Sequence, residues 1–193
     1  EQQQSQYINM FKEEGLDAVL LTHNIDSPFI TQLEQRNENV QFQRIDADLT
    51  DHFKEKVAKE EEETFKSNTE TLTAIFRKAL NNEKREVKVE KLKNENVASM
   101  VTLSEQSRRM QEMMKMYNMY GMDAGMFGTD VTLVLNANHP LVQYVLNNKD
   151  GEHVNLFCQQ LYDLAMLSNK PLNPEEMTAF ISRSNEIMML LTK

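Results

Sequence analysis

The side chains that could carry chemistry in this sequence form no recognisable catalytic or metal-binding motif. The sequence has no G-x-x-x-x-G-K-[ST] phosphate loop, and Gly121, Gly125 and Gly128 are spaced wrongly for G-x-G-x-x-G. The histidines lack the H-x-x-x-H or Cys/His spacing of metal ligands; they are His23, His52, His139 and His153. We therefore expect no catalytic and no metal-binding residue, although a Ser, His and Asp set distant in sequence stays open.

A methionine-rich stretch is the most unusual feature. Seven of the 13 methionines fall between Met110 and Met126, and glycines follow them. Methionine is flexible and polarisable, so a surface of it can repack around differently shaped partners. We interpret the stretch as an adaptable helix that binds partly unfolded proteins; packing of its apolar stripe into a core is the alternative. The candidate client-binding residues are Met110, Met113, Met114, Met116, Tyr117, Met119 and Met122.

Two amphipathic helices predicted near the end of the chain are the second candidate site. The helix that follows Gly151 has one apolar face, and the last helix is apolar nearly all round at its end. A helix of that kind must be covered on several sides, and a second copy of the chain would supply the cover as a four-helix bundle. Burial within its own domain is the alternative. The candidate dimer-interface residues are Phe157, Leu161, Leu164, Met177, Ile181, Ile187, Met188 and Leu191.

The elements before residue 46 predict a small parallel α/β unit. Helical patterns at residues 3–14 and 25–34 alternate with apolar, strand-like runs at 16–22 and 40–45. Gly15 suits the left-handed position that ends a helix, and Asp26 or Ser27 is the expected cap of the second helix. Because only two strands are visible, we interpret the unit as a remnant.

The rest of the chain predicts a mixed α+β domain with a three-stranded sheet and a long helix. The long helix is expected within residues 51–80, and the strands at 87–92, 97–103 and 130–135. The first two strands read as an antiparallel hairpin. Shorter helices are predicted from Pro140 to about residue 147, over 152–168, and from Asn173-Pro174 to about residue 191. The predicted domains are residues 1–46 and 47–193.

Composition excludes several classes of partner. Lys and Arg total 21 against 30 Asp and Glu, so the formal net charge of −9 disfavours nucleic acid and anionic membrane surfaces. No apolar run reaches the roughly 20 residues of a membrane helix. Cys158 is the single cysteine, so no internal disulfide is possible and nothing requires an oxidising compartment. We expect a cytoplasmic fragment of a longer protein.

Three segments, taken in order and spacing, resemble the ninety-kilodalton heat-shock protein chaperone family. Residues 15–26 (GLDAVLLTHNID) are similar to that family's G-x-E-V-L-x-L-x-D-P-I-D, with His23-Asn24 in place of Asp-Pro. Residues 135–142 (LNANHPLV) resemble I-N-P-x-H-P-L-V, with Leu135 and Ala137 as departures. Residues 161–168 (LYDLAMLS) resemble L-x-x-x-A-L-L-S/A. The departures in the first two segments affect the expected local loop shape.

The resemblance implies a role in protein folding under stress. Residues 1 to about 46 would end the family's middle domain, and the remainder would be its C-terminal dimerisation domain. The methionine-rich stretch occupies the place of the family's mobile client-contacting helix. ATP and magnesium would be used by the parent protein through a domain outside this chain. The absence of an E-E-V-D tail favours the bacterial branch. A dimeric adaptor without affinity for unfolded chains, and an enzyme that uses residues 22–28 as a binding loop, stay open.

Overall fold

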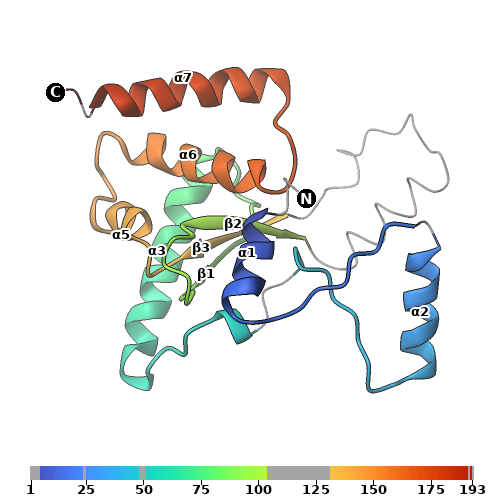
Figure 1. The fold of residues 1–193 in the computed structure, drawn as a ribbon. Helices are drawn as coiled ribbons and strands as arrows, with labels where there is room; N and C mark the ends of the chain where they lie inside the picture. The colour runs from blue at the N-terminus through green and yellow to red at the C-terminus, as the bar shows by residue number, and fades with distance from the viewer. Residues whose placement is uncertain (1–4, 24, 48–50, 104–130, 191, 193) are drawn as a thin grey trace.

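The computed structural model describes residues 5–23, 25–47, 51–103, 131–190 and 192 (Figure 1). Its elements combine helices with one small sheet, so the predicted α+β class is confirmed at that level. In chain order they are α1 (Ser5–Glu13), α2 (Asp26–Arg36), the 3-10 turns η2 (Asp51–Phe53) and η3 (Lys59–Glu61), α3 (Glu62–Ala79), β1 (Val87–Glu90), β2 (Ser99–Leu103), β3 (Val131–Asn136), α5 (Pro140–Asn147), α6 (Val154–Leu167) and α7 (Pro174–Leu190).

The three described strands form a sheet in the order β1-β3-β2. β1 runs parallel to β3 and pairs Val87 with Leu133, whereas β2 runs antiparallel to β3 and pairs Leu103 with Val131. The predicted hairpin between the first two strands is therefore wrong. β3 takes the central place and is buried along its whole length, as is β2, because both of its faces are covered and both of its edges are paired. Residues 93–96 still include a turn, in which Val97 N donates to Asn94 O (3.4 Å), but they belong to a crossover and do not join two neighbouring strands.

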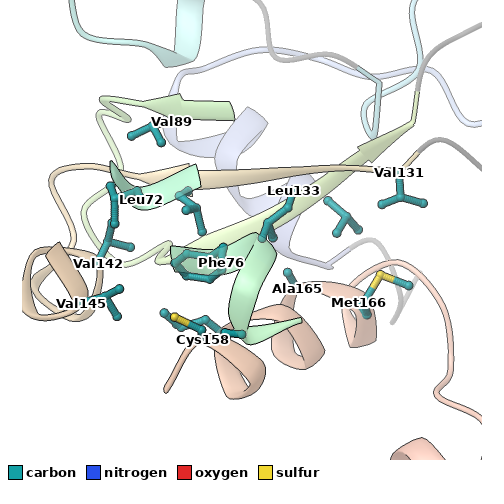
Figure 2. Packing of buried hydrophobic residues seen from close by; sticks show 14 of the residues in the cluster. Leu72, Phe76, Val89, Val131, Leu133, Val142, Val145, Cys158, Ala165 and Met166 are labelled. Atoms are coloured by element: carbon teal, nitrogen blue, oxygen red, sulfur yellow. The ribbon is translucent and has the colours of Figure 1, made fainter. Parts of the chain in front are cut away.

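Both faces of the sheet are covered by helices. Leu133 and Leu135 of β3 point into a core shared with α3, α5 and α6 (Figure 2), which includes Phe76. Val134 points to the opposite face, where a smaller cluster contains Tyr7 of α1. This alternation along one strand is the two-residue period of a sheet. α7 lies outside these layers, against α6 (Figure 1).

Asn136, at the end of β3, holds the segments around the sheet together. Its side chain is fully buried, and its Oδ1 accepts hydrogen bonds from Leu92 N (3.0 Å) and Asn138 N (3.0 Å). Its Nδ2 donates to Asn94 O (3.0 Å) and Val97 O (2.8 Å). One side-chain amide thus satisfies two backbone N–H groups and two backbone carbonyl groups that form no hydrogen bond between strands. The crossover from β1 to β2 is fixed in this way to the end of β3.

Local sequence signals explain where several helices end or begin. Gly15 has φ +65°, as predicted, and Leu16 N donates to Phe11 O (2.9 Å) to close α1. Asn81 takes the same left-handed position after α3, with φ 48°. At the start of α7, Asn173 Oδ1 accepts from Glu176 N (2.8 Å) and Asn173 N donates to Glu176 Oε2 (3.0 Å). This reciprocal pair confirms Asn173 as the predicted cap.

The strands predicted at residues 16–22 and 40–45 are absent, so the predicted α/β unit is wrong. Val19 and Leu20 are 81% and 71% exposed, instead of buried on two faces. A strand needs a neighbouring backbone to satisfy its N–H and C=O groups, and no described residue pairs its backbone with residues 17–22. The apolar run therefore stays extended and unpaired.

Two helix boundaries also differ from expectation. The long helix begins at Glu62 instead of near residue 51, because residues 53–55 pair with the chain after β1: Glu55 N donates to Lys91 O (2.8 Å). The residue in the cap position of α2 is Ile25, so the prediction of Asp26 or Ser27 as cap is wrong. The Asp26 carboxylate reaches back instead and accepts from His23 N (2.8 Å).

Replacement of Asn136 by alanine should be strongly destabilising. It leaves two backbone N–H groups and two carbonyls without their partner, which should lower the free energy of unfolding by about 3 kcal/mol. Urea denaturation followed by circular dichroism measures the change. Asn155→Ala, at an exposed position of α6, is the matched control and should shift stability by less than about 0.5 kcal/mol. Equal stability of the two variants would contradict the role of Asn136.

Candidate interaction surface of the C-terminal helix pair

α6 is fixed by its inner face, which packs on the sheet and on α3. Five of its residues are buried there, namely Val154, Cys158, Leu161, Ala165 and Met166. Two hydrogen bonds tie it to other elements: Ser99 Oγ donates to Leu161 O (2.8 Å), and Gln159 Nε2 donates to Ala79 O (3.1 Å). Burial raises the pKa of the Cys158 thiol to about 12, so this cysteine stays protonated and acts as an apolar core residue.

A polar anchor attaches α7 to the outer side of α6. Arg183 donates from Nε to Gln160 Oε1 (3.1 Å) and from Nη1 to Gln159 Oε1 (3.0 Å), and it pairs with the Asp163 carboxylate through Nη2. Ser184 Oγ accepts from Gln160 Nε2 (2.9 Å). Guanidinium offers five donors in a rigid fork, so one side chain fixes the position of α7 along α6.

The Asp163–Arg183 pair is largely shielded from water. Their side chains are 14% and 11% exposed. Burial raises the pKa of Asp163 above its ordinary value, even though the Arg183 charge lowers it. Desolvation is the largest influence on this pKa, and a shielded ion pair of this kind is better evidence for fixed geometry than for net stability. Removal of Arg183 alone would leave a shielded carboxylate without its partner.

Three large apolar residues of α7 are exposed to solvent. No residue of α7 is buried in the single chain. Ile181 and Met188 are 52% and 56% exposed and lie seven residues apart, so they share one stripe, with Met189 also exposed beside it. Met177 and Ile187 are half-buried, on the side that carries Arg183. The structure thus leaves an apolar flank, formed by Ile181, Met188 and Met189, on the helix that lies outside the layers.

The predicted interface residues of α6 are distributed differently. Leu161 is 2% exposed and belongs to the core of its own chain, whereas Leu164 is exposed. Phe157 is half-buried, and its ring lies 5.1 Å from that of Tyr144 on α5. Leu141, one turn before Tyr144, is also exposed. The apolar surface therefore continues from α6 onto α5.

Some predicted site residues lie outside the described part of the chain. These are all the candidate client-binding residues, from Met110 to Met122, and Leu191. The described strands still define where the methionine-rich segment is attached: residues 104–130 connect Leu103 to Val131, which are register partners in β2 and β3.

The polar anchor was not predicted from the sequence, although a signal for it exists. Asp163 is the only charged residue in α6, and Arg183 is the only basic residue in α7. Because α7 also carries Glu175, Glu176 and Glu186, the signal is the combination of one acidic residue in α6 and one basic residue in α7, which favours a contact between them. Tyr144 and Leu141 were missed because α5 is short and its exposed face carries only these two large apolar side chains.

Metal and membrane sites find no support in the described residues. Within these ranges, no three His, Cys, Asp or Glu side chains gather closely enough to hold a metal ion. His139 lies at the start of α5, where its Nδ1 accepts from Leu141 N (3.1 Å). None of the described helices is both long enough and apolar enough to cross a membrane.

Comparison with known proteins agrees with the resemblance in the sequence. The profile of the family described as "Hsp90 protein" matches residues 1–193. The chain is 33% identical over 156 residues to "Chaperone protein htpG" of Bacteroides fragilis (strain 638R), which covers 78% of this chain and 22% of that protein. It is 23% identical over 192 residues to "Chaperone protein HtpG" of Colwellia psychrerythraea (strain 34H), covering 98% of this chain and 28% of that protein.

The chain belongs to the Hsp90 family of chaperones. A third relative, "Chaperone protein HtpG" of Albidiferax ferrireducens, is 28% identical over 194 residues, which cover 96% of this chain. The chain spans only about a quarter of the length of the curated relatives it matches, with 22% to 28% of each covered. All three relatives are chaperones that carry the name HtpG.

Loss of Arg183 should loosen α7. Arg183→Ala leaves the Asp163 carboxylate shielded and without its ion-pair partner, which should lower the free energy of unfolding by about 2 kcal/mol. The double variant Arg183→Met with Asp163→Leu removes both charges and should recover most of that loss. Urea denaturation at one fixed protein concentration compares the three proteins. A double variant no more stable than Arg183→Ala would contradict this account of the anchor.

Proposed function

We propose that this chain supplies dimerisation and client contact to an ATP-dependent molecular chaperone. The observation that carries the proposal is the exposed apolar flank of α7, which includes Ile181 and Met188, in a member of the Hsp90 family. A flank of this kind on an outermost helix favours burial against another protein surface. ATP and magnesium belong, in this proposal, to a part of the parent protein outside this chain, and the setting is the cytoplasm.

The partner for the α7 flank is a second copy of the chain. α6 and α7 lie side by side, so two copies would bring four helices together across a two-fold axis. Ile181, Met188 and Leu164 would meet their symmetry mates, while Arg183 keeps α7 fixed to α6. A dimer joined at one end raises the effective concentration of any attached domains for each other.

Client contact is assigned to the methionine-rich segment. Its ends are held together by the pairing of Leu103 with Val131, so the segment is presented from one place on the sheet. The residues proposed to bind clients are those from Met110 to Met122, because thioether side chains adapt to varied apolar surfaces.

Residues 1–46 and 47–193 remain the proposed domains. Tyr7 and Met10 of α1, which belong to the first of them, pack with Val134 of the sheet in the second.

Charge on the α7 flank should dissociate the dimer. Ile181→Glu with Met188→Glu places carboxylates where the apolar stripe would be buried, and should weaken dimerisation at least about tenfold, a cost of 1.4 kcal/mol or more. Sedimentation equilibrium should then show the 22.5 kDa species at concentrations where the unchanged chain is twice that mass.

The matched control for this experiment is Ala179→Glu. Ala179 is exposed and lies two residues before Ile181, which is about 200° around the helix. The control should therefore leave the dimer intact. If the unchanged chain sediments only as a 22.5 kDa species at micromolar concentration, dimerisation by this surface is excluded.

Polar replacement in the methionine-rich segment should weaken client binding. Met113→Ser with Met116→Ser removes apolar contact area, and should reduce binding of a fluorescently labelled, partly unfolded protein about tenfold. Fluorescence anisotropy measures the binding, and circular dichroism checks that the fold is retained. Met10→Ser, in the smaller core cluster, is a contrasting variant that should lower stability instead.

The second candidate function is a dimeric adaptor without affinity for unfolded chains. It shares the α7 flank, so the dimer experiment does not separate the two functions. Binding of the unfolded protein does separate them: its absence from both the unchanged chain and the methionine variant favours the adaptor. An enzyme that uses residues 22–28 has lost its main support, because the strands that would frame such a loop are absent.

A further inference from the structure

A cleft lies at the carboxyl ends of the two parallel strands, on the side of the sheet opposite α1. It encloses about 350 Å³ between α3, α5 and the residues that follow β1 and β3. Its floor is apolar and is formed by Phe65, Leu72, Val89 and Leu146. This volume is at the lower end of the range for ligand pockets, so it suits one large apolar side chain with adjoining backbone.

Amide side chains on two walls complement the apolar floor. Asn68 projects from α3 and is half-buried, and its side chain makes no hydrogen bond to another described residue. On the opposite wall, Gln143 of α5 uses its Nε2 to donate to Ala137 O (2.6 Å), which leaves its Oε1 open as an acceptor. An amide group carries one donor pair and one acceptor, the same chemistry as a peptide bond. These walls therefore match the backbone of an extended peptide.

The rim of the cleft is acidic. Lys91 is neutralised by Glu61, whose Oε2 lies 2.6 Å from Lys91 Nζ. Glu60 also lines the cleft, is exposed, and makes no ion pair with the described residues. Glu62 and Glu63 follow in the first turn of α3 and add to the negative potential. A ligand with a positive charge beside its apolar group is favoured at this rim.

We propose that this cleft binds an extended peptide segment in which a large apolar side chain is flanked by lysine or arginine. The apolar side chain enters between Phe65 and Leu146, Asn68 and Gln143 bond the peptide backbone, and the basic neighbour meets Glu60. This site is separate from the methionine-rich segment and does not rest on its proposed role. It gives the chain a recognition element for short basic–apolar motifs.

The test uses two fluorescein-labelled pentapeptides, Gly-Lys-Leu-Lys-Gly and Gly-Glu-Leu-Glu-Gly, titrated with the whole chain in anisotropy measurements. The lysine peptide should bind about fivefold more tightly than the glutamate peptide, the size of a modest surface charge effect. Glu60→Lys should remove or reverse that preference. Glu70→Lys makes the same charge change at an exposed position of α3 that does not line the cleft, and should preserve it.

A blocking variant locates the peptide. Thr64→Trp places a large side chain in the cleft from its exposed rim, and should reduce binding about tenfold or more. Lys66→Trp adds the same side chain to an exposed position outside the cleft, and should leave binding unchanged. No binding of the lysine peptide to the unchanged chain, or equal binding by the Thr64→Trp variant, overturns the proposal.

The Met113→Ser, Met116→Ser variant separates this site from the proposed client surface. Retained peptide binding by that variant, together with loss in Thr64→Trp, supports the cleft. Peptide binding that is lost in the methionine variant and kept in Thr64→Trp moves the peptide to the methionine-rich segment, and the cleft proposal then fails while client binding stands.

Discussion

The buried amide of Asn136 is the contact on which the sheet and its connections depend. A crossover between β1 and β2 must leave the sheet and return on the far side of β3, and beyond its short pairing with residues 53–55 several of its backbone polar groups need other partners. Asn136 supplies those partners from the end of the central strand, by bonds to Leu92, Asn94 and Val97. The cleft at the ends of the parallel strands and the start of α5 both follow directly after this residue.

The burial of side chains decreases from the sheet around Asn136 toward the outermost helix, α7. β3 and the inner faces of α3 and α6 are buried, whereas α7 has no buried residue and is attached by the polar contacts of Arg183 together with half-buried apolar residues. This decrease in burial fits the proposal that the exposed face of α7 is buried against a partner. A polar anchor fixes the helix before the partner arrives, so less conformational entropy is lost when the partner binds. The apolar flank can then remain exposed without the helix detaching.

Helices were predicted well from the sequence, and strand pairing was not. Pro140, Asn173 and Gly15 mark helix ends by local chemistry, so their predicted positions are confirmed within a residue or two. Strand order depends on contacts between distant residues, and a short connection such as residues 93–96 has the same composition in a hairpin and in a crossover. The run around Val19 has the composition of a strand without a neighbouring strand in the structure. The outer flank of α7 was predicted from its all-round apolar pattern, whereas Arg183 required the contact with Asp163 to be seen.

The pairing of Leu103 with Val131 has an evolutionary consequence. Paired antiparallel residues lie only about 5 Å apart, so the sheet fixes the distance between the two ends of residues 104–130. The entropy of closing a chain segment grows slowly with its length, so this pairing sets no strong limit on how many residues connect the two strands. Selection on the client contact proposed for that segment can therefore act through its length and composition while the register of β2 and β3 is kept.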